Sequence, residues 1–344
     1  MSKAIPIEVS FNRAMGALLG VAIGDAMGMP TQTLNREQIL STYGHVADFM
    51  SAVPHQPVSG GLAAGTITDD TEQTILLARQ LIEDGNSFDE EKWVRSLLTW
   101  EKETHARGVN DLLGPSTRRA INALLKGVAA SETGRFGTTN SAMRITPVGI
   151  SVAAEPLSRL VDAVEETCRV THNTSEAIGS AAAVAVVISA GVAGGSFEDA
   201  APLALAAARL GEHRGCPATT GSISARIERA LELASQAPQD WASIAEKIGT
   251  SVAAIESVPM AFAVVRLSGC DVWKAAVLSA NIGDDTDTIG AIACAMAGAT
   301  TGAAAISADK VKTVLSVNHL NLAPLVQGLL LKRNQLPHHH EHEL

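Results

Sequence analysis

The sequence predicts an all-α protein, a compact single domain of helices packed on helices. Apolar residues recur at helical spacing in several segments, whereas no sustained run alternates apolar and polar residues as a half-buried strand would. Hydrophobic residues make up 46% of the 344 residues but aromatic residues only 3%, so the core must be built largely from small side chains. Small side chains let helices approach one another closely, which favours helix-on-helix packing.

Four segments show the periodicity of amphipathic helices most clearly. In the first, Ile75, Ala78 and Ile82 fall on one stripe, and Gly85 follows as a helix stop would. The other three repeat this spacing of apolar residues. The four predicted helices cover residues 71–84, 93–100, 223–234 and 241–248.

Two uncharged segments, residues 177–197 and 288–308, are about as long as a membrane span. They consist mainly of Ala, Gly, Ser and Thr rather than Leu, Ile and Phe, and they lack basic flanks, so both predict buried central helices. The N-terminal residues lack the apolar stretch and cleavage site of a signal peptide. We therefore expect a cytoplasmic protein without a membrane partner.

Loops rich in Gly, Pro, Asn and Thr separate the predicted helices and are the places where a site could be assembled. No linker is long or polar enough to divide the chain, so we expect one domain. Four histidines close to the C-terminus predict a frayed tail rather than a metal site. The predicted loops cover residues 29–65, 108–116, 134–147 and 211–221.

The formal net charge of −10 argues against a nucleic-acid or anionic-membrane partner, because both require clustered Lys and Arg. The cysteines show no CxxC spacing and lie mostly among apolar residues, so they predict buried free thiols in a reducing compartment. These cysteines are Cys168, Cys216, Cys270 and Cys294.

Two acidic clusters stand at the starts of predicted apolar helices. The first, TDDT, covers residues 68–71, and the second, DDTDT, covers residues 284–288. Helix capping is one explanation, because Asp and Thr favour helix N-termini. The second cluster, however, precedes a helix with no polar face and has no Lys or Arg nearby, so its carboxylates would be buried and unpaired. A divalent cation is the other explanation, and the residues alone leave both open.

The donor types in the two clusters suit hard cations of the magnesium type, which take oxygen ligands from carboxylates and hydroxyls. Two such clusters suggest one shared site. Four or more converging carboxylates need two divalent ions to balance their charge, an arrangement suited to holding vicinal oxygens and activating water.

Six motifs, in order, make the chain resemble the ADP-ribosylglycohydrolase family from about Arg13 to about Leu331. They are RAMGALLGVAIGDAMGMPTQ, TDDTEQT, GPSTRRAINAL, NSAMRITPVGI, THNTSEAIGSAAA and ANIGDDTDTIGAIACAMAGA. The resemblance implies a compact orthogonal helix bundle with a binuclear metal cleft that holds two Mg²⁺ or Mn²⁺ ions. It divides the chain into an N-terminal extension (1–12), the family domain (13–331) and a His-rich tail (332–344).

The resemblance also implies roles for individual positions. The implied metal ligands come from both acidic clusters: Thr68, Asp69, Asp70, Asp285, Asp287 and Thr288. The implied substrate contacts are Gln32, Thr139, Asn140, Ser141, Met143 and His172. Asp25 would lie just outside the metal ligands.

Some of these positions have simpler explanations. His172 could cap the helix that follows it, and Arg144 could clamp its own loop. Asp25 lies in an apolar helix, where an unpaired carboxylate is costly, so a role near the metals is favoured for it. Gly24 and Gly28 are expected to serve helix packing.

Three features depart from the family pattern. Gln32 stands where many relatives carry a Glu that is a candidate acid or base. Asp284 stands where many relatives have a glycine, and the loop around Thr139 and Asn140 lacks a Gly-Asn-Gly sequence. Because an amide cannot transfer a proton in this way, Asp70 and Asp284 are the candidates for handling the proton of the attacking water.

The implied activity is metal-dependent hydrolysis of the glycosidic bond of an ADP-ribosylated substrate. Gln32 and the lack of a basic cluster for a pyrophosphate leave a nucleoside or simple ribosyl N-glycosidase open as an alternative. A non-catalytic metal- or nucleotide-binding module is the third possibility. The expected partner is a small molecule or an ADP-ribosylated substrate, and the sequence predicts no oligomeric state.

Overall fold

A computed structural model shows a helical protein and describes residues 6–85, 87–106, 114–218 and 221–335. Within these ranges no strand forms, and two isolated backbone bridges join Thr139 to Ala253 and Thr174 to Cys216. The all-α prediction is therefore confirmed. In chain order the helices are α1 (Ile7–Gly28), α2 (Arg36–Tyr43), α3 (Asp69–Glu83), α4 (Glu90–Ala106), α5 (Pro115–Leu125), α6 (Ala130–Thr133), η1 (Ala142–Arg144), α7 (Thr146–Ser151), α8 (Leu157–Cys168), α9 (Ser175–Val192), α10 (Phe197–Gly211), α11 (Ile223–Gln236), α12 (Trp241–Ile248), α13 (Ala254–Ser268), α14 (Val272–Ile282), α15 (Thr286–Thr301), η2 (Ala303–Ala305), α16 (Ala308–Val317) and α17 (Ala323–Gln335).

The four amphipathic helices predicted from the sequence are present as α3, α4, α11 and α12. One prediction was wrong, because α2 lies within residues 29–65, which we expected to form a loop. This helix buries only Ile39, so its sequence carries no apolar stripe. It begins instead with a capping box, in which the side chains of Asn35 and Gln38 each bond to the other residue's backbone N–H.

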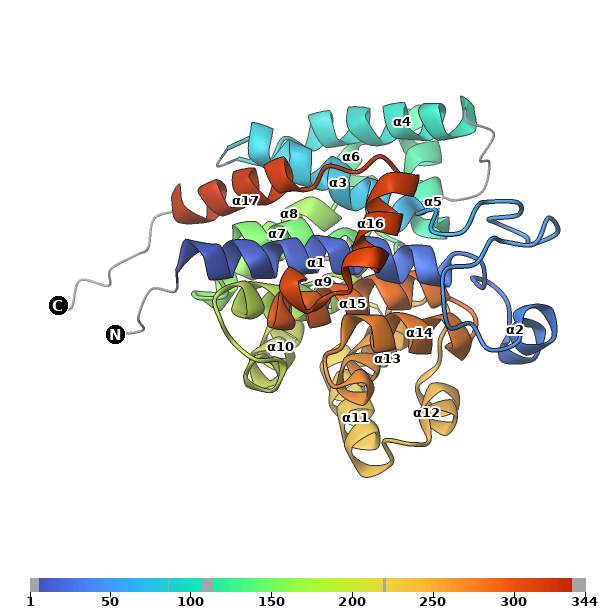
Figure 1. Ribbon diagram of the computed structural model, residues 1–344. Helices are drawn as coiled ribbons and strands as arrows, with labels where there is room; N and C mark the ends of the chain where they lie inside the picture. Colours follow the sequence, from blue (N-terminus) through green and yellow to red (C-terminus); the bar gives the residue numbers. More distant parts are fainter. Residues whose placement is uncertain (1–5, 86, 107–113, 219–220, 336–344) are drawn as a thin grey trace.

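Helices α1 and α15 lie far apart in the sequence but pack side by side in the centre of the molecule (Figure 1). A Cβ atom at Gly24 would lie 2.0 Å from the carbonyl oxygen of Gly290, so the two backbones touch with no side chain between them. Gly16 and Gly28 meet the backbone of α15 in the same way. The packing role predicted for Gly24 and Gly28 is confirmed.

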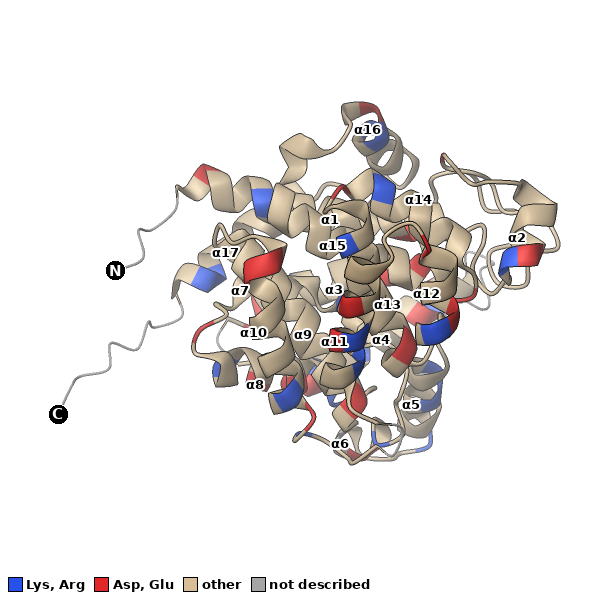
Figure 2. Ribbon diagram, turned by 90° about the horizontal axis from the view of Figure 1, so that it is seen from below, with Lys and Arg blue, Asp and Glu red and all other residues tan. Residues whose placement is uncertain are grey.

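Helix α9 also runs through the core, where it contacts α1, α7, α8, α10 and α15. Both uncharged segments thus form buried helices as predicted, although α15 ends at Thr301 because the chain turns at Gly302, which has a φ of +89°. By length and apolarity, α1 and α9 are each capable of crossing a membrane, but 89% of the apolar window in α9 is buried inside the protein. Figure 2 shows that charged residues lie mainly on the outer helices and loops.

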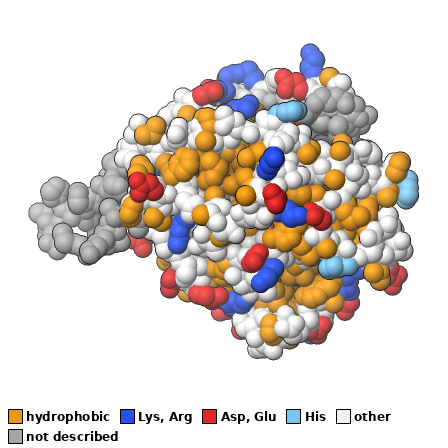
Figure 3. Space-filling view, viewed as in Figure 1, with side chains coloured by type: hydrophobic (Ala, Val, Ile, Leu, Met, Phe, Trp, Pro, Cys, Tyr) orange, Lys and Arg blue, Asp and Glu red, His pale blue; other side chains and the backbone are white. Residues whose placement is uncertain are grey.

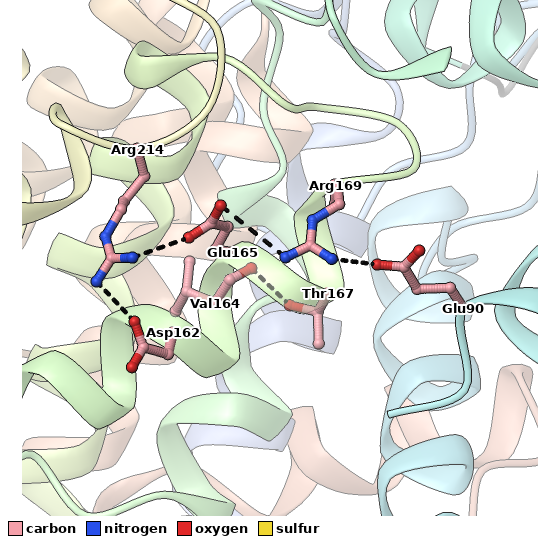
Figure 4. A network of polar contacts seen from close by, with 7 residues as sticks. All are labelled: Glu90, Asp162, Val164, Glu165, Thr167, Arg169 and Arg214. Carbon is pink, nitrogen blue, oxygen red and sulfur yellow. Dashed lines mark hydrogen bonds and ion pairs between the residues drawn. The ribbon is translucent and has the colours of Figure 1, made fainter. Parts of the chain in front are cut away.

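An ion-pair network holds the segment that follows α8 (Figure 4). Arg169 pairs with Glu90 of α4 at 2.7 Å and with Glu165 at 3.9 Å. Arg214, which follows α10, pairs with Asp162 at 2.7 Å and with Glu165 at 3.5 Å. The network therefore joins three helices just before the chain reaches residues 171 and 172.

The ends of the described chain lie near each other on the surface (Figure 1). The boundaries predicted at residues 12 and 332 fall inside α1 and α17, and residues 336–344 of the predicted tail lie outside the described residues. Figure 3 shows apolar side chains gathered over the middle of one face. An apolar groove runs between α1 and α17 and is lined in part by Ile7, Phe11, Leu330 and Leu331.

Candidate metal centre

The two acidic clusters stand at the N-termini of α3 and α15. Thr68 is the N-cap residue of α3 and Asp285 that of α15, yet neither side chain accepts a capping hydrogen bond from its helix. Capping therefore does not explain the clusters. The start of α15 is held against the end of α1, because Gly28 has no side chain where a Cβ would lie 2.3 Å from the backbone nitrogen of Asp287.

Asp25 is fully buried and fixes the start of α3. Its carboxylate accepts hydrogen bonds from the backbone N–H groups of Thr68, at 2.9 and 3.0 Å, and of Thr71, at 3.1 Å. It also accepts from both hydroxyls, at 2.7 Å for Thr68 and 2.5 Å for Thr71. Burial raises the pKa of Asp25 to about 6 although these hydrogen bonds lower it. Asp25 thus orients Thr68, one of the predicted metal ligands.

Four further aspartates place buried carboxyl groups next to one another. Burial is the main cause that raises the pKa of Asp285 to about 7 and the pKa values of Asp69, Asp70 and Asp287 well above their usual range. For Asp70 the charge of Asp287 adds most to the effect of burial. None of the four forms an ion pair with a Lys or Arg of the described residues. The cluster therefore lacks positive charge.

Asp70 is the least satisfied of these carboxylates. Its Oδ2 lies 3.3 Å from the Thr68 hydroxyl and 3.5 Å from the Thr288 hydroxyl, whereas its Oδ1 is buried without any hydrogen-bond partner. The Thr68 hydroxyl has one proton and lies closer to Asp25, so it donates to Asp25 and leaves the negative charge of Asp70 with little hydrogen bonding. A buried carboxylate oxygen without a donor is costly unless a cation or a bound molecule completes it.

A cavity of about 420 Å³ opens beside the cluster. Of the predicted metal ligands Asp69, Asp285, Asp287 and Thr288 line it, while Thr68 and Asp70 do not. All but one of the predicted substrate contacts line it as well; the exception is Ser141, whose hydroxyl donates to the carbonyl of Ala177. The lining residues are Gln32, Thr33, Val58, Asp69, Gly114, Pro115, Thr117, Thr139, Asn140, Met143, His172, Ser251, Val252, Asp284, Asp285, Asp287 and Thr288.

Asn140 connects the cavity loop to the cluster. Its Nδ2 donates to the hydroxyl of Ser257 and lies 3.5 Å from Oδ2 of Asp285, while its Oδ1 is buried without a partner. The loop itself is anchored to the start of α13, where the N–H of Ala254 donates to the carbonyl of Thr138 at 3.0 Å. The unpartnered Oδ1 is thus a second acceptor at the site that no group of the described residues satisfies.

His172 is buried and lies between two threonines. Its Nε2 lies 3.2 Å from Oγ1 of Thr139, and its Nδ1 lies 2.7 Å from Oγ1 of Thr171. Burial and the charge of Arg144 hold the pKa of His172 well below its usual range, so the ring is neutral at pH 7. The capping alternative for His172 was wrong, because Thr174 is the N-cap of α9 and accepts from the N–H of Ala177.

Gln32 and Asp284 lie on the same side of the cavity. The N–H of Thr33 donates to the carbonyl of Asp284 at 2.6 Å, and the N–H of Asp284 donates to the carbonyl of Leu34 at 2.8 Å. Asp284 has a φ of +59°, and its exposed side chain accepts a hydrogen bond from the Thr250 hydroxyl at 2.9 Å. The two residues that depart from the family pattern are thus neighbours.

The donor set fits a hard cation in kind, since it consists of carboxylate and hydroxyl oxygens, one of them unpartnered. Within the described residues, no group of three or more His, Cys, Asp or Glu side chains already surrounds one point closely enough to hold a metal. A cation would therefore have to draw these side chains together.

Several residues at the site were not predicted from the sequence. Thr71 holds Asp25, and Gln73 donates to Oδ2 of Asp69 at 3.2 Å. Both lie within the TDDTEQT motif, and the four-residue spacing of Asp69 and Gln73 is a signal for contact on one helix face. The expectation that Arg144 clamps its own loop was wrong, because its guanidinium bonds to Gln73 and Thr171 instead.

The cysteines contribute nothing to this site. All four are free, as predicted, but Cys216 and Cys270 are only partly buried. Neither lies inside a helix: Cys216 forms the bridge to Thr174, and Cys270 lies at a turn.

Comparisons with known proteins agree with this architecture. A family model described as ADP-ribosylglycohydrolase matches residues 7–337, six residues beyond the predicted domain at each end. The Escherichia coli protein YegU is 32% identical over 327 residues, which cover 94% of this chain and 98% of that protein. ADP-ribosylarginine hydrolase Tri1 of Pseudomonas putida is 26% identical over 318 residues, 91% of this chain and 77% of that protein.

A solved structure titled ADP-ribosylglycohydrolase-related protein complex has the same fold, with a TM-score of 0.69 at 23% identity over 95% of this chain and 99% of that chain. The family model spans nearly the whole sequence, including the two acidic clusters and the cavity loop. The chain therefore belongs to the ADP-ribosylglycohydrolase family.

Proposed function

We propose that the protein is a metal-dependent hydrolase that cleaves the glycosidic bond between the ribose of an ADP-ribosylated substrate and its leaving group. One observation carries the proposal: buried carboxylates that form no ion pair within the described residues gather beside a cavity lined by the expected substrate contacts. Membership of a glycohydrolase family supports the reaction type.

The metal ligands would be the residues expected from the two acidic clusters. Two divalent cations would balance the charge of their four carboxylates. The unpartnered Oδ1 of Asp70 supports this assignment, because it is an acceptor of the kind that Mg²⁺ or Mn²⁺ takes. When bound, these ions supply positive charge that holds vicinal ribose hydroxyls and favours ionisation of water.

The side chains of the cavity would orient the ribosyl group and accept the proton of the attacking water. His172 is neutral, so it offers a hydrogen bond without adding charge. Of the two candidates for the proton, Asp284 lines the cavity and is exposed, whereas Asp70 lies behind the lining. We therefore assign the proton to Asp284 and a ligand role to Asp70.

Asp284→Asn and Asp70→Asn test this division. The first variant should lose most of kcat and keep its affinity for Mg²⁺, because Asp284 is not placed among the ligands. The second should lose Mg²⁺ affinity. Full activity in Asp284→Asn would return the proton-accepting role to Asp70.

Two observations bear on the substrate class. The described lining of the cavity includes no Lys or Arg, which keeps a nucleoside or simple ribosyl compound as the second candidate. The N-terminus of α5 also reaches the cavity through Gly114, Pro115 and Thr117, and the buried Thr117 hydroxyl has no partner in the part of the chain that the structure describes. A helix N-terminus offers N–H donors to phosphate oxygens without a basic side chain, which supports the ADP-ribosyl substrate.

Turnover of ADP-ribosyl-arginine, compared with a panel of nucleosides in the presence of Mg²⁺ or Mn²⁺, tests the proposal. We expect hydrolysis of the ADP-ribosyl compound that stops when EDTA removes the metal. Turnover of nucleosides alone would favour the second candidate. No turnover of any compound, together with tight nucleotide binding, would favour a non-catalytic binding module.

A further inference from the structure

Arg144 is a buried cation at the point where two sides of the site meet. It is 1% exposed, lies in η1 between α3 and the segment before α9, and forms no ion pair within the described residues. Its guanidinium donates to Oε1 of Gln73 at 2.7 Å and to Oγ1 of Thr171 at 2.5 Å, and it lies 5.4 Å from the ring centre of Trp93. The guanidinium group has only donors, so every polar group that it contacts must accept.

The contact with Gln73 determines how the carboxylate of Asp69 is held. Because Oε1 of Gln73 accepts from Arg144, the amide must turn its Nε2 in the other direction. That Nε2 lies 3.2 Å from Oδ2 of Asp69. The reversed amide would place its NH₂ group against the guanidinium, donor against donor. Arg144 thus fixes a hydrogen bond to one oxygen of a predicted metal ligand.

The contact with Thr171 determines which nitrogen of His172 carries the proton. The Thr171 hydroxyl accepts from Arg144, and its own proton can then go to Nδ1 of His172, 2.7 Å away. Nδ1 is therefore the acceptor of the neutral ring, and Nε2 carries the proton and donates to Oγ1 of Thr139 at 3.2 Å. In the opposite tautomer Nδ1 would carry the proton, and no hydrogen-bond contact of Thr171 within the described residues would then offer its hydroxyl proton an acceptor.

We propose that Arg144 is a positioning residue that, through Gln73 and Thr171, fixes both the orientation of the Asp69 carboxylate and the tautomer of His172. The roles of Asp69 toward the metal and of His172 toward the substrate rest on the proposed function. The hydrogen-bond chain itself does not. It runs without a break from Asp69 through Gln73, Arg144, Thr171 and His172 to Thr139.

The tautomer can be measured directly by ¹⁵N NMR of the histidine rings, with the signals of His172 identified by their loss in His172→Asn. We expect an unprotonated Nδ1 and a protonated Nε2 in the wild type. In Thr171→Val this preference should be lost, because no hydroxyl proton then points at Nδ1. Thr167→Val is the matched control, since Thr167 is also buried but its hydroxyl donates to the carbonyl of Val164. A protonated Nδ1 in the wild type would overturn the proposal.

The other branch is tested by calorimetric titration of the metal-free protein with Mg²⁺ alone. Gln73→Leu should weaken Mg²⁺ binding by about tenfold or more, the usual effect of losing a partner that orients a metal ligand. Its control is Gln80→Leu, another buried glutamine of α3, which bonds to Asp84 and Asp89 instead. Thr171→Val should leave Mg²⁺ affinity within about twofold and weaken binding of ADP-ribose by about tenfold, the value of one hydrogen bond.

These measurements separate positioning from a general structural role. Two results would show that Arg144 only holds the fold together. In the first, Gln73→Leu and Thr171→Val each weaken the binding of Mg²⁺ and of ADP-ribose equally. In the second, neither variant changes the Mg²⁺ affinity or the tautomer of His172. Arg144→Gln, whose amide can accept as well as donate, should both weaken Mg²⁺ binding and lose the tautomer preference of His172. If this variant does not fold, Gln73→Leu and Thr171→Val still test the role of Arg144. A wild type that binds neither Mg²⁺ nor ADP-ribose would refute the proposed function, while the NMR result would still decide the role of Arg144.

Discussion

Without metal, the protein should become less stable as the pH rises, because its carboxylate cluster is buried. Burial is the main cause that raises the pKa of Asp285 from 3.8 to about 7. The folded state therefore holds this proton more tightly than the unfolded state does, and the free energy of unfolding falls with rising pH between the two values. The fall is about 1.4 kcal/mol per pH unit, so Asp285 alone contributes a loss of about 4 kcal/mol over the interval.

Urea denaturation followed by circular dichroism, in EDTA from about pH 4 to about pH 8, measures this loss. Saturating Mg²⁺ should largely abolish the pH dependence, since a bound cation favours the ionised carboxylates and stabilises the folded state. Asp285→Asn should make the free energy of unfolding depend less steeply on pH, because an amide does not ionise. A metal-free stability that stays constant or increases with pH would refute the assignment of buried, unpaired carboxylates.

Three further predictions concern packing, metal binding and substrate choice. Gly24→Ala should lower the free energy of unfolding by about 1–3 kcal/mol in urea titrations, because its Cβ would overlap the carbonyl of Gly290. Gly114→Ala is the control and should change this free energy little, because its Cβ meets no atom of the described residues within 4 Å. Asp287→Ala should abolish tight Mg²⁺ binding in calorimetry while the helical circular dichroism spectrum persists; unchanged affinity would mean that the site lies elsewhere. Gln32→Glu should change the ratio of kcat/KM for ADP-ribosyl-arginine to that for nucleosides by about tenfold, equivalent to about 1.4 kcal/mol, since only the first carries a pyrophosphate that a new carboxylate would repel. Equal effects on both substrates would mean that Gln32 does not lie near a bound pyrophosphate.

The helices that the sequence predicts best are those in which burial follows the helical period. α3 buries Leu77, Ala78 and Leu81 and leaves Arg79 and Glu83 exposed, so the pattern of its apolar residues carries the information. α2 buries a single residue and could be recognised only from its capping box. In α1 and α15 the packing is made by backbone atoms, so apolarity identifies these helices as buried but does not say that they touch.

The acidic side of the candidate site was predictable because its carboxylates occur in two short clusters. Each cluster lies at a helix start, so local sequence alone brings its members together. The polar chain around Arg144 was not predictable in the same way. Gln73, Arg144 and Thr171 come from three separate segments, and their contacts depend on how those segments pack.

The direct contact between the backbones of α1 and α15 has a consequence for biosynthesis. The two helices begin at Ile7 and Thr286, so the ribosome must make most of the chain before they can meet. Until then the glycine-lined face of α1 has no partner, and the start of α15, which holds half of the acidic cluster, does not exist. Contacts of such sequence separation form late in folding, and exposed apolar helices are prone to aggregate meanwhile. The nascent protein should therefore depend on chaperones until α15 has emerged, and shorter nascent chains should lack the second acidic cluster.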